Sequence, residues 1–197
     1  MVIAILVIAA IAVSGSLGYY ASTISKPAGS SQSQNTIVNI DVIPDYGGAG
    51  FDAFVLEPNM QNGIVPTAGT NTTAPGTNNN NVTVSAGTTV KFVLTSIDTA
   101  ILMNYSSAVS TPFTLYNDTA DGQAALHYTT GQQISNMPIS HTFTIKELGV
   151  DIPIPPTTVV TFSMTFSKAG TYMYYCETPC GPGMGLMGYM EGFVIVK

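Results

Sequence analysis

Short runs of β-branched and aromatic residues, bounded by Gly, Pro or Asn, make up much of the chain after residue 36. Apolar and polar side chains alternate in Thr89–Ser96 and in Val159–Phe166, which is the period of a strand with one buried face. Similar runs predict further strands at Ile37–Ile43, Phe51–Glu57, Val82–Ser85, Ile139–Ile145, Thr171–Cys176 and Gly192–Val196. Because no amphipathic helix accompanies them, the pattern predicts an all-β sandwich or barrel.

Two stretches lack a regular pattern of apolar residues, and we expect both to be insertions. Residues 61–80 are a tract of Gly, Thr and Asn that is typical of a mobile loop, and residues 99–137 form a longer stretch. Loops of that length inside a compact domain are usually functional or disordered. The second stretch ends shortly before His141.

The N-terminus differs from the rest of the chain, because Met1–Val13 is wholly apolar and the first charged residue is Lys26. About 20 apolar residues can cross a bilayer as a helix. Residues 1–25 therefore predict a transmembrane anchor, in which Tyr19 and Tyr20 stand where interfacial aromatic residues would lie.

A cleaved signal peptide is the alternative for the same segment. The run Ser14-Gly15-Ser16 could serve as its cleavage site, although no Lys or Arg precedes the apolar residues. Residues 26–36 are small and polar and are expected to form a linker, with the folded domain over residues 37–197.

Charge narrows the possible functions. Of the 197 residues, 45% are hydrophobic and only 8% are charged, against about 25% charged residues in an ordinary soluble domain. The chain has 5 basic residues, all Lys, and 11 acidic ones, for a net charge of -6. No basic surface is available to hold phosphates, so the composition argues against nucleic-acid binding. About 160 residues follow the apolar N-terminus, which suits one domain.

Four Asn-x-Ser/Thr triplets point to an external domain. They begin at Asn71, Asn81, Asn104 and Asn117, in regions rich in Asn, Thr and Gly. In an exported chain such triplets are glycan acceptors on surface loops. Together with the apolar N-terminus they predict a glycoprotein domain on the extracytoplasmic face of a membrane.

The residues that carry chemistry gather near the end of the chain, in a glycine-rich loop between two predicted strands. The loop contains these sulfur-bearing residues: Cys176, Cys180, Met184, Met187 and Met190. Thiolate and thioether sulfurs favour copper in its lower oxidation state, whereas one imidazole suits both states. A Cys, Met and His set on a rigid β scaffold is therefore typical of an electron-transfer copper site.

This part of the chain resembles the cupredoxin family, and most closely the copper A domain of subunit II of haem-copper terminal oxidases, of archaeal type. The resemblance covers about residues 81–196 and includes Val82–Phe92 as an early strand pair, Ser140–Phe143 as the first ligand strand and Ala169–Tyr172 as the turn before the Cys strand. It implies a Greek-key sandwich or barrel. It also implies a non-catalytic subunit that takes electrons from an external cytochrome or small copper protein and passes them to a haem in a membrane subunit.

The resemblance also implies a ligand set. Cys176 and Cys180 take the positions of two bridging thiolates, with the Thr178 carbonyl between them and His141 as the upstream imidazole. Met184 stands where the family has a His, and Met187 takes the axial Met position. The electron-transfer partner is expected to dock on the apolar loop around Met184 and Met187.

Met184 is the main departure from the family pattern, because no His follows His141. A thioether at this position would favour reduced copper and so raise the reduction potential of the site. The site could hold one copper ion or two. Counting back from the last predicted strand makes Met190 a competitor of Met187 for the axial role. Since Met has no proton to gain, the replacement predicts copper retention in acid; loss of copper at mildly acid pH with retention in Met184→His would refute this.

A second resemblance is to sulfocyanin, a membrane-tethered single-copper cupredoxin of thermoacidophilic archaea, which shares the anchor and the Asn-rich loops. Sulfocyanin has one Cys and a His in its loop, which this chain contradicts.

Three alternatives remain at this point. Two Cys in an external protein could form a disulfide, as in a pilin-like structural β-sandwich of the cell surface. The chain could also be an oxidase subunit that has lost its metal and serves as a scaffold. His127, in the long insertion, could cap the site, although a lone loop His is more often solvated.

Overall fold

The computed structural model describes residues 35–44, 52–56, 80–119, 122–181, 184 and 189–197. The described residues belong to one compact unit, Ser33–Lys197, and form strands with a single short 3-10 helix, Lys146–Leu148. The strands are β1 Asn35–Ile43, β2 Ala53–Leu56, β3 Val82–Val84, β4 Thr88–Ser96, β5 Met103–Ala108, β6 Phe113–Thr119, β7 Gly122–Tyr128, β8 Gln133–Ile139, β9 His141–Ile145, β10 Val150–Ile154, β11 Thr158–Phe166, β12 Gly170–Tyr175 and β13 Glu191–Val196. The all-β prediction is confirmed.

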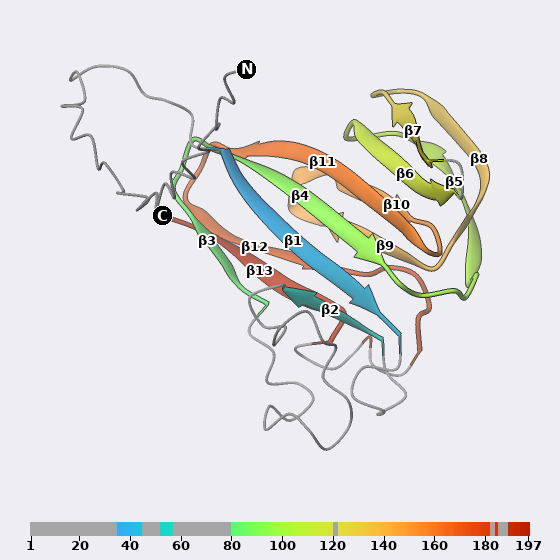
Figure 1. Cartoon of the computed structure of the whole chain (residues 1–197). Coiled ribbons are helices and arrows are strands. Elements are labelled where there is room, and N and C mark those ends of the chain that lie inside the picture. Colours follow the sequence, from blue (N-terminus) through green and yellow to red (C-terminus); the bar gives the residue numbers. More distant parts are fainter. Residues whose placement is uncertain (1–34, 45–51, 57–79, 120–121, 182–183, 185–188) are drawn as a thin grey trace, which may run out of the picture. The chain divides into compact units, whose positions relative to one another are not determined.

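Two large sheets form the layers of a sandwich (Figure 1). One has the order β2-β1-β4-β11-β6-β7 and the other the order β10-β9-β12-β13-β3, while β5 and β8 form a separate pair. Most neighbours are antiparallel, but β1 pairs with β4 and β13 pairs with β3 in parallel. β9 and β12 pair in antiparallel through Tyr175 and Thr144, so the residues that follow β12 continue along β9 toward its first residue, His141.

The two sheets meet in an aromatic core. Phe92 of β4 stacks on Phe162 of β11 with ring centroids 4.9 Å apart. Across the sandwich, Phe92 lies 5.3 Å from Phe143 of β9, which in turn stacks on Tyr174 of β12 at 4.8 Å. The apolar positions that alternate in the sequence therefore point inward from both layers.

The stretch 99–137 is regular, so the prediction that it contains no regular element is wrong. It holds β5, β6 and β7 and most of β8, and β6 and β7 extend the six-stranded sheet. Most residues of β5 and β8 are exposed or half-buried, which weakens the apolar alternation on which the expectation relied. β10 also went unpredicted, and it is joined to β9 by a turn in which Gly149 takes a left-handed φ of 64°.

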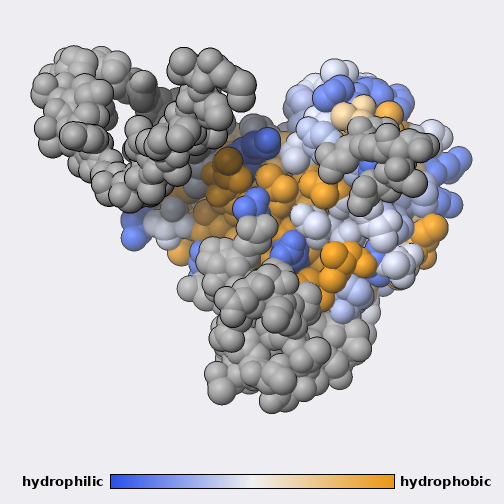
Figure 2. All heavy atoms as spheres, viewed as in Figure 1, coloured by the Kyte–Doolittle hydropathy of each residue, from blue (hydrophilic) through white to orange (hydrophobic). Residues whose placement is uncertain are grey.

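The expected transmembrane anchor and the tract 61–79 lie outside the described residues. Among the residues that are described, no helix is long and apolar enough to cross a membrane. Figure 2 shows apolar and weakly polar residues over β1, β4 and β11, with strongly hydrophilic residues scattered among them.

Candidate metal centre

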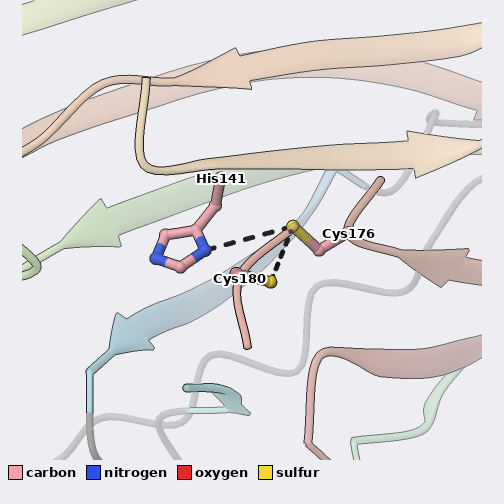
Figure 3. Close-up of side chains that lie close together, drawn as sticks. All are labelled: His141, Cys176 and Cys180. Atoms are coloured by element: carbon pink, nitrogen blue, oxygen red, sulfur yellow. Dashed lines mark hydrogen bonds between the residues drawn. The ribbon is translucent and has the colours of Figure 1, made fainter. Parts of the chain in front are cut away.

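Two neighbouring strands bring the candidate ligands together. His141 is the first residue of β9, and Cys176 directly follows the last residue of β12. Cys180 comes four residues later, in the loop that leads toward β13. In Figure 3 the sulfur of Cys176 lies between the ring of His141 and the sulfur of Cys180. The sequence prediction that these three residues share one site is therefore supported by their positions.

The three side chains are close enough to bind one metal ion together. The Sγ atoms of Cys176 and Cys180 lie 3.3 Å apart, and Nδ1 of His141 lies 4.0 Å from Sγ of Cys176. One ligand atom from each residue falls within 4.8 Å of the others. Both Cys are free thiols and buried, and His141 is fully buried. The site is thus a closed cluster of two sulfurs and one imidazole nitrogen.

Hydrogen bonding makes Cys176 the more acidic of the two thiols. The Cys180 thiol donates to Sγ of Cys176, and this bond, with help from His141 and the Thr142 N–H 3.5 Å away, lowers the pKa of Cys176 well below its usual range despite burial. The same bond, together with burial, raises the pKa of Cys180. The shared hydrogen bond thus favours the thiolate form at Cys176 and the thiol form at Cys180.

His141 is subject to opposing effects. Burial lowers the pKa of its imidazole, but the Cys176 thiolate, Asp52 and Asp98 together raise that pKa above its ordinary value. The ring therefore lies in a negatively charged surrounding, which also favours a bound cation.

Main-chain atoms complete the surroundings of the sulfurs. The carbonyl oxygen of Thr178, the predicted carbonyl ligand, lies 3.7 Å from Sγ of Cys176 and accepts the N–H of Cys180 at 2.7 Å. The buried Oγ1 of Thr178 has no hydrogen-bond partner among the described residues. The N–H of Cys176 donates to the Met190 carbonyl at 3.0 Å. These bonds fix the loop so that the thiols point inward.

For two of the three Met candidates the structure shows how deeply the side chain is buried. Met184 is half-buried against the core, and Met190 is buried within the same apolar cluster as both Cys. Met187 lies outside the described residues. His127 is exposed on β7, where Nδ1 lies 3.0 Å from Oγ1 of Thr114, so the prediction that it is a solvated His is confirmed. The choice among the Met ligands stays a prediction.

Sequence reasoning missed two carboxylates beside His141. Oδ2 of Asp98 lies 2.9 Å from Nε2 of His141, and a carboxylate oxygen of Asp52 lies within 4.8 Å of both. One feature of the sequence sets Asp98 apart: it is the only charged residue between Lys91 and Asp118.

The donor set fits copper. Thiolate sulfur and neutral imidazole nitrogen are the ligands that copper takes in both of its common oxidation states. Both sulfurs and the facing ring nitrogen are already close and dry in the structure, so little needs to rearrange on binding. The alternative of a disulfide between Cys176 and Cys180 is not what the structure has, since the two sulfurs lie 3.3 Å apart and not at the 2.03–2.05 Å of a bond.

No model of a known protein family matches the sequence, and no curated protein sequence matches it either. Solved structures do. Rusticyanin from Thiobacillus ferrooxidans has 16% identical residues and a TM-score of 0.36, over 84% of this chain and 79% of that one. The periplasmic domain of subunit II of cytochrome oxidase of Bradyrhizobium japonicum has 13% identity and a TM-score of 0.37, over 82% of this chain and 83% of that one.

A chain of a heme-copper terminal oxidase dimer is similar to a smaller part of the molecule. It has 17% identity and a TM-score of 0.29 over 60% of this chain, which spans about half, 52%, of the length of that chain. The structures to which this chain is similar thus include a copper protein, rusticyanin, and the periplasmic domain of an oxidase subunit II.

Proposed function

We propose that this protein is a copper-binding electron-transfer domain. The observation that supports the proposal is the buried cluster of Cys176, Cys180 and His141, in which the two sulfurs lie 3.3 Å apart and one ring nitrogen faces them. A closed, soft donor set suits a group that changes charge without leaving the protein.

Each residue has a distinct role in the proposal. Cys176 supplies the first thiolate, because its pKa is already low, and Cys180 loses its proton when a cation binds beside it. His141 supplies Nδ1, and the Thr178 carbonyl and Met184, Met187 or Met190 are candidates for weaker ligands. When bound, copper supplies a one-electron couple, and the protein's part is to hold the same geometry in both states.

The finer proposal concerns partners and place, and the sequence resemblance supports it. The domain would be the subunit II type component of a haem-copper terminal oxidase, with one or two copper ions and a single-pass anchor holding it on the extracytoplasmic face. It would accept electrons from a cytochrome or small copper protein that docks near Met184 and Met187, and pass them to a haem.

Metal analysis combined with a visible spectrum tests the proposal. The full chain would be reduced, loaded with copper, freed of excess metal and then oxidised. We expect one or two tightly held copper ions per chain and intense thiolate-to-copper bands in the visible. A mononuclear and a dinuclear site differ in stoichiometry. No retained copper, with Cys176 and Cys180 oxidised to a disulfide even after reduction and reloading, would overturn the proposal.

That contrary result would favour a structural β-sandwich. The observation on its side is the same short distance between the two sulfurs, because a modest approach of Cys180 to Cys176 would allow a disulfide. In a pilin-like surface protein or a metal-free oxidase scaffold, the disulfide would survive copper loading and the spectrum would stay featureless.

A further inference from the structure

Asp98 is a buried carboxylate on the far side of the His141 ring from the sulfurs. Its side chain is only 5% exposed, and Oδ2 lies 2.9 Å from Nε2 of His141. Nδ1 of the same ring faces Cys176. The imidazole is thus held between the Asp98 carboxylate at one nitrogen and the sulfur of Cys176 at the other.

Three hydrogen bonds fix Asp98 in place. The Ala100 N–H donates to Oδ1 at 2.8 Å, while Oδ2 accepts from His141. The Thr157 N–H donates to the Asp98 main-chain carbonyl at 2.9 Å. Thr157 takes a φ of 50°, which is strained for a β-branched residue and persists only where the surroundings require it. Hydrogen bonds therefore hold both the side chain and the main chain of Asp98.

The segment after Asp98 is also hydrogen-bonded to the two residues that directly precede His141. The Ser140 hydroxyl donates to the Ala100 carbonyl. The Leu102 N–H donates to the Ile139 carbonyl at 2.9 Å. The segment that follows Asp98 is therefore hydrogen-bonded to the segment that precedes His141, which fixes the relative orientation of carboxylate and imidazole before any metal binds.

We propose that Asp98 is the positioning residue of His141. Its carboxylate accepts the Nε2–H, which keeps the proton on that nitrogen, holds the plane of the ring and leaves Nδ1 as the donor toward the sulfur cluster. This inference rests on the proposed copper function. A carboxylate at the second nitrogen of a metal-bound His fixes the tautomer and makes the ring a better donor.

The charge of Asp98 has a second consequence. A nearby negative charge stabilises the oxidised copper ion more than the reduced one, because the oxidised ion carries one more positive charge. The couple exchanges one electron, which the copper ion gains or loses. Asp98 therefore works against Met184, whose thioether would favour the reduced ion.

Asp52 provides a matched control. Its carboxylate lies near the same atoms, but it acts on His141 through charge, whereas Asp98 also makes a hydrogen bond with the ring. Asp52→Asn removes a neighbouring charge and leaves the Asp98 contact intact. Asp98→Asn removes the charge and leaves a single acceptor oxygen for the two donors that Asp98 serves, and Asp98→Ala removes both acceptors.

The first test uses copper affinity and the redox equilibrium of the loaded full chain. We expect Asp98→Ala to weaken copper(II) binding by about 10- to 100-fold, as loss of such a partner does at other metal sites. At one fixed solution potential, Asp98→Asn should raise the ratio of reduced to oxidised copper by about tenfold and shift the thiolate bands, with a clearly smaller change for Asp52→Asn. Equal effects of Asp98→Asn and Asp52→Asn would leave charge alone as the cause and overturn the positioning role.

The second test reads the hydrogen bond directly by ¹⁵N NMR of the histidine rings. The chain has only 2 His, and exposed His127 serves as the internal reference. We expect a slowly exchanging Nε2–H of His141 in the copper(I)-loaded wild type, which is lost in Asp98→Ala and kept in Asp52→Asn. Fast exchange in the wild type would overturn the inference.

Failure of the proposed function is distinguishable from failure of this inference. If the wild type binds copper but the Asp98 variants match it in affinity, spectrum and exchange, the inference fails and the copper function stands. If the wild type retains no copper, the copper function fails. The same exchange measurement on the metal-free chain then decides whether Asp98 orients His141, because protection should still depend on Asp98.

Discussion

The strands β4 and β9, one from each large sheet, bury their residues differently. In β4 buried positions alternate with more exposed ones, so one face of the six-stranded sheet meets solvent. In β9 all residues are buried, including His141, Thr142 and Thr144. Polar groups are stable there only when they are hydrogen-bonded, and each of these is.

This difference explains why the candidate metal ligands lie on β9 and directly beside it. A strand with a solvent face can exchange its outer side chains at little cost, whereas a strand covered on both faces holds every side chain in a fixed position. His141 and the neighbouring Cys176 use the second kind of environment. Four changes test the contrast between the covered and the exposed regions.

The largest effect is expected from Cys176→Ser. This change removes the sulfur that lies between the other two donors, so copper affinity should fall by more than about 100-fold and the thiolate bands should disappear. Ser163→Ala on the exposed face of β11 is the matched control and should bind copper like the wild type. Unchanged bands in Cys176→Ser would place the copper elsewhere.

The next effect concerns folding. Phe143 is fully buried on β9 and contacts aromatic rings of both sheets, so Phe143→Ala should lower the free energy of unfolding by about 3–5 kcal/mol. Thr161→Ala, on the solvent side of β11, should change it by less than about 0.5 kcal/mol. Urea unfolding of both variants measures the difference. Similar losses of unfolding free energy would contradict the contrast between the buried position on β9 and the solvent-facing position on β11.

A smaller effect on the free energy of unfolding is expected at the contact between β5 and β10. The Tyr105 hydroxyl donates to Oδ2 of Asp151 at 2.8 Å, and Asp151 also accepts from Thr144 of β9. Tyr105→Phe should therefore cost about 1–2 kcal/mol of unfolding free energy. Tyr172→Phe loses only an exposed bond to the Lys168 carbonyl and should cost less; the reverse order in urea unfolding would refute this.

The smallest effect is a dependence on pH. Burial raises the pKa of the Asp151 carboxyl above its ordinary value. Its contribution to stability is therefore fully present below the unfolded pKa of about 3.9 and is lost as pH rises through the folded pKa. Asp151→Asn should gain stability relative to the wild type as pH rises from 4 to 7, measured by urea unfolding at each pH. A constant difference would contradict the assignment.

The strands could be predicted from the sequence wherever one face is buried. Thr88–Ser96 and Thr158–Phe166 agree with expectation to within one residue, because their alternation records a single buried face. β5 to β8 were not predicted, because few of their residues form an alternating apolar pattern; in β5, for example, only Tyr105 is buried. Their pairing depends on partners distant in the sequence.

The site was predictable to a similar degree. Cys176, Cys180 and His141 could be named because their chemistry is rare in this chain, with 2 Cys and 2 His. Asp98 could not, because its role depends on a contact with a residue 43 positions away. Spacing reveals ligands that share a loop, whereas a supporting carboxylate becomes visible only when the fold joins two segments.

Copper K-edge X-ray absorption of the copper-loaded full chain tests the central claim most directly. The account predicts a short copper–sulfur shell together with nitrogen scattering from one imidazole, and loss of most of the sulfur shell in Cys176→Ser. Copper bound only by nitrogen and oxygen, with the two thiols still free, would contradict the account.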